Sequence, residues 1–579
     1  MRRWQTVLAA CLLALTAAIV LGCRWFGPHD LYEKDQPKTM AYTADILVHG
    51  RYALPRDMIY QPATKPPMYN WIDAAVVGAS GVWNEWTLKF PSVLGVLATG
   101  GIVYAMARRA SHHYSGATVV GLLATGIWFT FGSDVRHGSV LRLGYLARPD
   151  MLLTMFCTAA WACFTVAAER PNSRTAFRPA MAAWLCVAAA VLTKGPAAAL
   201  PAVFGVVYAT VRVFRPRPVP RAFARPSRWD PMISYFALGR AWPVLGLAIV
   251  AAAGFGWLNA AAGHDARHVA DVILGAEVAG RLTQTPEGFR SPWYASLMWF
   301  VTKAWPWGAV AVVGLILVAW LPRVRRAAGP AALYLLIVLI GLSVPAAKRM
   351  DYLLPAFAPA SVLVALVIAD VVRYRVLTAA ALVTAVATAL VMAVGKHHAV
   401  DAAVPVGVVV AAMICYVIER RRAVPLGLLT VVPLVLAVLL GRIHLRKSLE
   451  AANRWSDNAV AFVDQVRQTV PTDAKLLVIV RGKHPLVTLL GRHQGSYLTP
   501  NDLATAEYVI LPTQPDLSAV VTSRPLPIGF DVVEQRELST LGLYRKVPLD
   551  RLIAYQKACA EWTVTENPYH APGTVFRDD

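Results

Sequence analysis

Residues 33–71 read EKDQPKTMAYTADILVHGRYALPRDMIYQPATKPPMYNW and lie between two long apolar stretches of the chain. The segment contains Glu33, Asp35 and Asp45, then Lys65 followed by two prolines, with tyrosine and tryptophan throughout. Charged residues beside a lipid bilayer are costly unless they are solvated or used, so they are candidates for function. An aspartate and a lysine in a loop held against lipid suit chemistry on the charged headgroup of a lipid.

The composition is that of a protein with many membrane spans. Of the 579 residues 57% are hydrophobic, more than in soluble domains. The formal charge is +22, from 56 basic and 34 acidic residues. Because the basic residues cluster between apolar stretches, this excess indicates membrane topology and not nucleic-acid binding. The seven cysteines have no metal-binding spacing and predict neither a disulfide framework nor a zinc site.

About thirteen apolar stretches approach the length of roughly 20 residues that a helix needs to cross a bilayer. We interpret the first as an uncleaved helix and not as a signal peptide, because many further spans follow it. The predicted spans are residues 5–22, 91–107, 116–132, 151–168, 179–193, 196–213, 241–258, 304–321, 330–345, 353–372, 376–394, 402–417 and 424–441.

Arginines occur in alternate connections between these spans, and this pattern orients the chain. With the N-terminus in the cytoplasm, every predicted inner loop contains arginine, and the catalytic candidates fall on the periplasmic side of the cytoplasmic membrane. The outer side then receives the C-terminus from about residue 442 and the loops at about 23–90, 133–150, 259–303, 346–352 and 395–401. The loop at 133–150 departs from the rule, because it carries Arg136, Arg142 and Arg148. Either the rule is noisy there or these arginines face something anionic.

From residue 442 onward the composition becomes that of a soluble domain. Residues 474–480, 506–512 and 541–547 are rich in β-branched and aromatic residues and predict strands. No phosphate-binding glycine motif and no HExxH motif occurs there. We therefore predict an all-α polytopic membrane domain at residues 1–441, with amphipathic helices in the outer loop 23–90, and a small outer α/β domain at residues 442–579.

Four polar groups lie at the outer rims of the predicted spans: Asp35 with Lys65, Arg148 with Asp150, Lys194 before Gly195-Pro196, and Lys348 to Tyr352. A supporting stretch at 264–294 contains His264, His268, Glu277 and Arg281. Each residue alone has an ordinary explanation, since an aspartate caps helices and a lysine extends to the interface. The two histidines suit solvated loop positions better than metal ligands. The groups are stronger candidates for function together, because they all lie on the predicted outer side of the membrane.

Together these residue types fit one reaction. Cations bind a phosphate and stabilise the negative charge that develops on a leaving phosphate. A carboxylate near the sugar carbon can deprotonate an acceptor hydroxyl as a general base. Inversion by direct displacement needs one such base, not the paired carboxylates of glycosidases. The combination describes glycosyl transfer from a lipid-linked phosphosugar.

At these residues the sequence resembles the integral-membrane glycosyltransferases of the GT-C class, in the superfamily of protein O-mannosyltransferases and lipid A aminoarabinose transferases. The resemblance spans about residues 1–375. The matching positions are Asp35-Gln36-Pro37-Lys38, Gly50, Thr64-Lys65-Pro66-Pro67, Arg148-Pro149-Asp150, Leu192 to Pro196, Arg281 ahead of Pro292-Trp293-Tyr294, and Lys348 ahead of Tyr352-Leu353-Leu354-Pro355.

The resemblance implies roles for these residues. Asp35 would be the catalytic carboxylate. The substrate-binding residues would be Lys65, Arg148, Asp150, Lys194, Arg281, Lys348 and Tyr352. The cations among them other than Arg148 would hold the donor phosphate or nearby groups, and Asp150 would shape the site or assist a metal. Two positions depart from the family pattern, because Gln36 replaces the second acid of an Asp-Glu pair and Thr64 replaces a glutamate that can help hold a divalent cation. The sequence therefore leaves two possibilities, no cofactor or a divalent cation.

The predicted function is transfer of a sugar from a polyprenyl-phosphate donor to an acceptor hydroxyl at the outer membrane face. The predicted partners are the donor, a lipid, glycan or protein acceptor, and the bilayer, but not nucleic acid. Two other classes are a transporter or flippase of an anionic lipid-linked envelope precursor, and a non-catalytic envelope assembly factor. Transporters tend to contain repeats, and none is visible here. The sequence does not specify the sugar, the acceptor, the lipid length or the oligomeric state.

Overall fold

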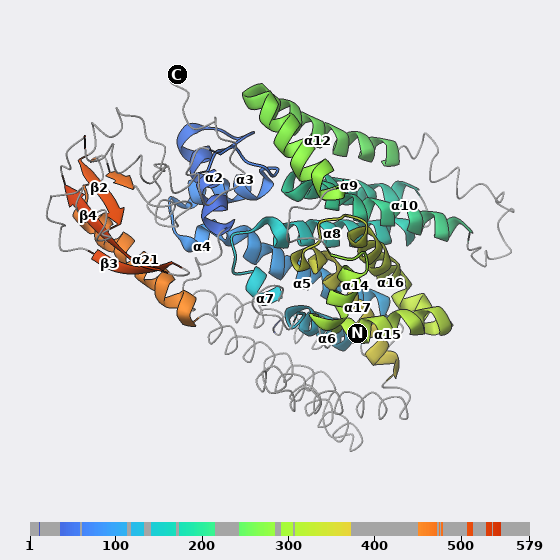
Figure 1. The fold of residues 1–579 in the computed structure, drawn as a ribbon. Coiled ribbons are helices and arrows are strands. Elements are labelled where there is room, and N and C mark those ends of the chain that lie inside the picture. Colours follow the sequence, from blue (N-terminus) through green and yellow to red (C-terminus); the bar gives the residue numbers. More distant parts are fainter. Residues whose placement is uncertain are drawn as a thin grey trace, which may run out of the picture.

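The computed structural model describes a bundle of helices and a small sheet with one helix beside it (Figure 1). Among the predicted spans, those at 376–394, 402–417 and 424–441 lie outside the described residues, as does the span at 5–22 apart from residue 11. The described ranges are 35–57, 61–112, 117–132, 140–169, 173–214, 242–283, 291–304, 307–371, 450–471, 476–478, 507–512, 529–534 and 537–545, with residues 11, 474 and 550.

Among the described residues up to 371, all of the elements are helical apart from an isolated β-bridge between Arg56 and Pro62. In chain order they are α2 Asp35–His49, α3 Met68–Ser80, α4 Glu85–Leu88, α5 Phe90–Ala110, α6 Ala117–Phe129, α7 Val140–Leu143, α8 Pro149–Glu169, α9 Ser173–Lys194, the 3₁₀ turn η1 Gly195–Ala198, α10 Ala199–Phe214, α12 Trp242–Arg267, the π-helix η3 His268–Gly280, α13 Arg281–Thr283, α14 Ala295–Thr302, α15 Trp307–Trp320, α16 Pro322–Ser343, the 3₁₀ turn η4 Met350–Leu353 and α17 Leu354–Val371.

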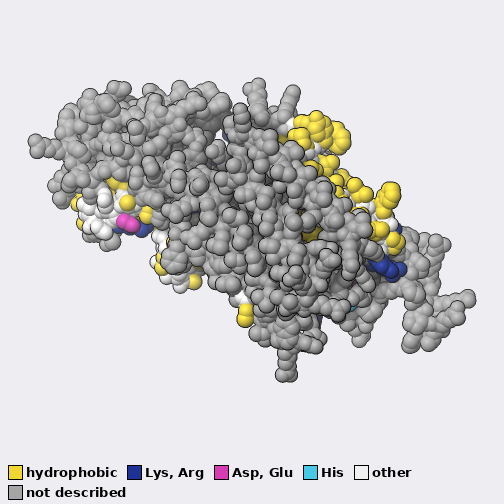
Figure 2. Space-filling view, turned by 90° about the horizontal axis from the view of Figure 1, so that it is seen from below, with side chains coloured by type: hydrophobic (Ala, Val, Ile, Leu, Met, Phe, Trp, Pro, Cys, Tyr) yellow, Lys and Arg dark blue, Asp and Glu magenta, His cyan; other side chains and the backbone are white. Residues whose placement is uncertain are grey.

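Several of these helices can cross a membrane. In the described part of the chain, six helical stretches are long and apolar enough, or seven if α14 and α15 together form one bent span. Large apolar side chains on them are exposed, such as Phe255 at 72% and Trp320 at 79%, which suits contact with lipid. Figure 2 shows hydrophobic side chains over the visible described helices at the right of that view. The chain is a multi-pass membrane protein, and the predicted count of thirteen spans is not established by these helices.

Helices α8, α9 and α10 run antiparallel to their chain neighbours. The Lys194 ammonium at the end of α9 contacts the Asp150 carboxylate at the start of α8. The Tyr208 hydroxyl of α10 lies 3.5 Å from Glu169 at the other end of α8. The predicted spans at 179–193 and 196–213 are therefore two antiparallel helices, although no polar loop separates them. Gly195 has a φ of 72° at the turn between them, a conformation that glycine adopts without strain.

Two ends of the bundle can be defined from α8. Its 21 residues rise about 30 Å, which matches the hydrocarbon thickness of a bilayer. We call the end with Asp150 and Lys194 the site end, and the end with Glu169 the distal end.

The expected helices of the first outer loop are α2 and α3, and they pack on each other. Met40 and Ile46 of α2 are buried, as is Tyr69 of α3. The Asn70 side-chain amide donates to the Thr39 carbonyl oxygen at 2.6 Å. The Tyr69 hydroxyl donates to the Leu88 carbonyl oxygen at 3.3 Å, which ties α3 to the end of α4, two residues before α5. These contacts hold Asp35, the first residue of α2, against the site end.

The helix α12 leaves the bundle where it meets the chain between α2 and α3. The Trp257 indole N–H donates to the Ala53 carbonyl oxygen at 2.9 Å, and His268 Nε2 lies 3.2 Å from the Ala63 carbonyl oxygen. Leu54, Val269 and Ile273 are buried in one cluster with Trp257. The helix that contains the predicted span 241–258 continues to Arg267, and η3 lies over the loop that leads to Lys65.

The C-terminal region contains a mixed sheet beside α21 Glu450–Thr469 (Figure 1). The strands are β1 Leu476–Val478, β2 Tyr508–Pro512, β3 Gly529–Glu534 and β4 Glu537–Arg545, in the order β1-β2-β4-β3. β1 and β2 are parallel, whereas β4 is antiparallel to both β2 and β3. The three strands expected from the sequence are present, and β3 is additional. The sheet and helix agree with the predicted α/β character.

Candidate active site

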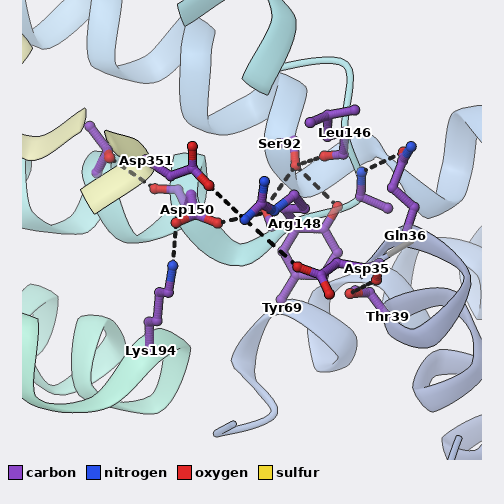
Figure 3. A network of polar contacts seen from close by, with 12 residues as sticks. Asp35, Gln36, Thr39, Tyr69, Ser92, Leu146, Arg148, Asp150, Lys194 and Asp351 are labelled. Atoms are coloured by element: carbon purple, nitrogen blue, oxygen red, sulfur yellow. Dashed lines mark hydrogen bonds and ion pairs between the residues drawn. The ribbon is translucent and has the colours of Figure 1, made fainter. Parts of the chain in front are cut away.

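A single arginine connects three aspartates at the site end (Figure 3). The Arg148 guanidinium Nη2 lies 2.8 Å from Asp351 Oδ2 and 3.8 Å from Asp35 Oδ2. Its Nε lies 3.6 Å from Asp150 Oδ2. The Arg148 side chain is only 6% exposed, so its positive charge is compensated within the protein. The arginine that departed from the topology rule therefore faces the protein's own carboxylates.

Asp150 extends this network to a lysine. Its other carboxylate oxygen, Oδ1, pairs with the Lys194 ammonium, and both side chains are largely buried. The same ammonium lies 4.8 Å from the centroid of the Tyr352 ring, a distance at which a cation is attracted to an aromatic face. Five residues named from the sequence, including Tyr352, are thus brought together from α2, α8, α9 and η4.

The backbone ahead of α8 is held by hydrogen bonds that place Arg148. The Ser92 hydroxyl of α5 lies 2.6 Å from the Leu146 carbonyl oxygen and 3.1 Å from that of Arg148. The Gln36 side-chain oxygen accepts the Ala147 backbone N–H at 3.0 Å. Gln36 is fully buried. The residue that departs from the family's acidic pair therefore anchors α2 to this loop.

The three aspartates differ in accessibility. The Asp35 side chain is 42% exposed, against 4% for Asp150 and 11% for Asp351. Burial alone would raise the pKa of Asp35, but the positive charges of Lys65, Arg148, Arg349 and Lys38 outweigh it. The pKa of Asp35 is therefore below its ordinary value of 3.8. Asp35 is an ionised carboxylate that a substrate can reach.

Lys65 is close enough to this network to interact with it electrostatically. Burial lowers the pKa of Lys65 below its ordinary 10.5, and repulsion from Lys194 adds to that effect. Asp35, Asp150 and Glu277 favour the charged form without restoring the ordinary pKa. Within the described residues no carboxylate lies at ion-pair distance from Lys65. An anion placed between Lys65 and Lys194 would relieve their repulsion.

Lys348 and Arg281 are not joined to the network by a direct contact. Lys348 is 5% exposed, and its ammonium donates to the Pro345 carbonyl oxygen at 2.7 Å. No carboxylate in the described ranges forms an ion pair with it. Arg281 begins α13, directly after η3, and its side chain lies outside what the structure describes. Lys348 is therefore a second buried cation that an anionic ligand could compensate.

Asp351 is the residue that sequence reasoning underrated. It lies in the rim group Lys348 to Tyr352 but was not among the predicted site residues, because nothing local marks it as the partner of Arg148. The two are 203 positions apart in the chain. The motif that supplied Tyr352 was the only available signal.

The carboxylates of this site do not form a metal-binding group. Among the residues that the structure describes, no set of three or more His, Cys, Asp and Glu side chains could hold a metal ion. Asp35, Asp150 and Asp351 instead turn toward one guanidinium, which supplies the positive charge between them. Arg148 is thus the cation that these three carboxylates share among the described residues.

Comparisons with known proteins give one family match and several structural matches. The family model described as dolichyl-phosphate-mannose-protein mannosyltransferase matches residues 64–220, which include Lys65, Arg148, Asp150 and Lys194. No protein with a curated description matches the chain by sequence.

The structural matches include ArnT from Cupriavidus metallidurans. Its crystal structure bound to undecaprenyl phosphate has a TM-score of 0.66 and 16% identity, covering 93% of this chain and 98% of ArnT. The apo structure of ArnT gives 0.64 and 15%, covering 92% and 98%. An oligosaccharyltransferase from Archaeoglobus fulgidus gives 0.42 and 10%, covering 89% and 70%. At these identities the match to ArnT establishes the fold.

Proposed function

We propose that the chain is a member of the GT-C superfamily of protein O-mannosyltransferases and lipid A aminoarabinose transferases, as the family match and the ArnT fold support, and that it transfers a sugar from a polyprenyl-phosphate donor to an acceptor hydroxyl. The observation that carries this proposal is the accessibility of Asp35. It is the exposed member of three carboxylates gathered around one buried arginine. A substrate hydroxyl can approach it, whereas Asp150 and Asp351 are occupied within the protein.

In the proposed step Asp35 acts as general base. The acceptor oxygen attacks the anomeric carbon and gives its proton to the Asp35 carboxylate. The bond between the anomeric carbon and the phosphate oxygen breaks, and polyprenyl phosphate leaves with the electron pair. One displacement inverts the anomeric centre and needs no second carboxylate. The lowered pKa of Asp35 keeps the base ionised at neutral pH.

The lysines supply charge to the leaving group. A phosphodiester carries one negative charge, and the departing phosphate monoester carries a second, so cations nearby stabilise the transition state more than the bound donor. Lys65 and Lys348 are the best candidates to bind the leaving phosphate, because in the described part of the chain neither forms an ion pair with a carboxylate. We assign Lys194 and Arg281 to the same phosphate on the strength of their motif positions.

Arg148 has a positioning role in this scheme. Its guanidinium is shared by three carboxylates, which leaves it poorly placed to bind a donor phosphate as well. It holds the Asp35 carboxylate beside the start of α8. Asp150 fixes the Lys194 ammonium over the Tyr352 ring. We therefore assign Arg148 to the residues that shape the site, the role already expected for Asp150.

The fold relationship supports a polyprenyl phosphate as the lipid of the donor. ArnT from Cupriavidus metallidurans binds undecaprenyl phosphate in its crystal structure. A membrane lipid with a terminal phosphate suits a site at the end of a bundle whose helices face lipid. We place this end at the outer face of a cytoplasmic membrane, as the arginine pattern predicts, together with a C-terminal domain at residues 442–579 that contributes to acceptor choice.

The test uses the full chain, purified in nanodiscs, with a panel of polyprenyl-phosphate sugars and no acceptor. Slow transfer to water releases polyprenyl phosphate, which mass spectrometry detects. We expect release from one donor by the wild type and a loss of about 10²–10⁴-fold in Asp35→Asn, the range that removal of a general base produces.

Asp271→Asn is the matched control. Asp271 is an exposed aspartate of η3, and its variant should release donor as the wild type does. Equal release by the wild type and Asp35→Asn would contradict the base assignment. Tight binding of a donor without release by any variant would favour the transporter class instead.

A further inference from the structure

A cavity lies at the distal end of the bundle, away from the candidate active site. Its volume is about 720 Å³, and it is lined by residues of α5, α8, α16 and α17. Glu169 lines it, and Glu169 is the last residue of the helix whose second residue, Asp150, belongs to the active site. Along α8, Glu169 lies about 28 Å from Asp150, and Trp161, which also lines the cavity, lies about 16 Å from it.

The charged groups around this cavity are mainly basic. Arg109, Arg323 and Arg326 line it, against one carboxylate, Glu169. That carboxylate is already engaged, because Arg109 Nε and Nη2 donate to Glu169 Oε2 at 3.2 and 2.9 Å. The side chains of Arg323 and Arg326, in the first turns of α16, are exposed. The cavity therefore has an excess positive charge at its mouth.

The inner wall of the cavity is apolar. Trp161, Val362 and Pro330 line it. Trp161 is fully buried, stacks on Tyr334 with ring centroids 5.6 Å apart, and its indole N–H has no acceptor within the described residues. An unpaired buried N–H costs stability unless a ligand or water accepts it. The wall combines a hydrophobic surface with one free donor.

From this arrangement we propose that the cavity binds the headgroup of an anionic phospholipid. The phosphodiester lies between Arg323 and Arg326 at the mouth, and the start of the acyl chains packs on the apolar wall. Basic pockets between transmembrane helices are a general mode of anionic lipid binding. The site differs from the donor site in position, and the proposal does not depend on the proposed reaction.

The role of arginines in membrane topology does not by itself account for the cavity. Arginines near the ends of spans orient a membrane protein whether or not a cavity lies between them. Arg178 of α9 is such a residue, since it is exposed and does not line the cavity. A cavity bounded by three arginines and an apolar wall has, in addition, a shape that a lipid headgroup can fill. Arg178 is the matched control because it is an exposed arginine outside this cavity.

The test measures lipid binding to the purified full chain by native mass spectrometry. Dioleoyl phosphatidylglycerol is titrated against wild type, Arg323→Gln/Arg326→Gln and Arg178→Gln, with dioleoyl phosphatidylcholine as the neutral lipid. We expect the double variant to bind phosphatidylglycerol about thirtyfold more weakly, the effect of two arginines near a lipid surface. Arg178→Gln should stay within about twofold of wild type, and phosphatidylcholine should bind all three proteins equally.

Three results would overturn the proposal, and the last two need titrations of C55 polyprenyl phosphate and of inorganic phosphate beside those of the two phospholipids. One is equal binding of phosphatidylglycerol by wild type and the double variant, with both proteins folded by thermal unfolding. The other two concern the source of the phosphate. A larger loss for C55 polyprenyl phosphate than for phosphatidylglycerol would assign the cavity to the product lipid, and displacement of phosphatidylglycerol by inorganic phosphate alone would assign it to a free anion.

Discussion

The two ends of α8 use charge in opposite ways. At the site end, Arg148 and Asp150 are 6% and 4% exposed, and their partners come from α2, α9 and η4. At the distal end, Arg109 and Glu169 form an ion pair with side chains 45% and 30% exposed, beside two exposed arginines. Buried charges need partners with fixed geometry, whereas exposed ones act through water at little cost.

Under the two proposals, this difference separates the residues assigned to the reaction from those assigned to lipid binding. A network of buried ion pairs fixes the positions of its side chains, and catalysis requires reacting groups in fixed positions. Exposed arginines around an open cavity instead attract whatever anion the surroundings offer. Substitutions of the same chemical type at the two ends should therefore have different effects.

The largest contrast should come from Arg148→Gln and Arg326→Gln. Removing the Arg148 guanidinium leaves Asp150 and Asp351 buried without their shared cation, and we expect a loss of about 3–5 kcal/mol in the free energy of unfolding. Arg326→Gln should change it by no more than about 0.5 kcal/mol, as for other exposed surface residues. Thermal and denaturant unfolding in detergent measure both. Equal stability of the two variants would remove the distinction between the ends.

The next effect concerns Lys65. Lys65→Gln removes a charged hydrogen-bond donor to the donor phosphate, so kcat/KM for the donor should fall by roughly 10–100-fold, the effect of about 1.5–3 kcal/mol. Lys303→Gln, an exposed lysine at the end of α14, serves as the control and should remain within about twofold.

The pH dependence sharpens the Lys65 prediction. The pKa of Lys65 is below its ordinary 10.5 because of burial and the charge of Lys194. Activity that needs the charged form is complete below that pKa and is lost as the pH rises through it. Lys65→Arg should move this loss to higher pH, because a guanidinium stays protonated. An alkaline limb that is unchanged in Lys65→Arg would assign it to another group.

A smaller effect is expected at Gly195, which joins the site end of α9 to α10. Its φ of 72° disfavours a side chain, although nothing lies within 4 Å of an added Cβ. Gly195→Ala should destabilise the protein by about 1 kcal/mol through backbone strain alone. The matched control is Gly78 of α3, which has space for a Cβ and no unusual φ, so Gly78→Ala should stabilise by about 0.5–1 kcal/mol. Opposite signs in thermal unfolding would support this account; a loss of stability in both variants would contradict it.

The sequence predicted the elements of the site better than their connections. Hydrophobic length and arginine spacing located the ends of α5, α8, α9 and α10, and the rim motifs supplied Asp35, Arg148 and Lys194. These are local signals, because each depends on residues that are close together in the sequence. The number of spans was not recoverable with the same certainty, because α6 is a short apolar helix of 13 residues.

The connections depend on contacts between distant parts of the chain. Gln36 and Ala147 are 111 positions apart, and Arg148 and Asp351 are 203 apart. No period or motif specifies which carboxylate a buried arginine will meet. For this reason Arg148 was predicted as a substrate ligand, and Asp351 was omitted, whereas the geometry favours a positioning role for both.

The central claim is that the exposed carboxylate performs the chemistry and the buried ones maintain the site. The most direct test is single-turnover release of polyprenyl phosphate from the active donor, measured beside thermal unfolding, for Asp35→Asn and Asp351→Asn. The account predicts that Asp35→Asn loses release about 10²–10⁴-fold with its unfolding transition retained, and that Asp351→Asn loses stability first and release in proportion to the folded protein lost. Release retained in Asp35→Asn but abolished in a stably folded Asp351→Asn would contradict it.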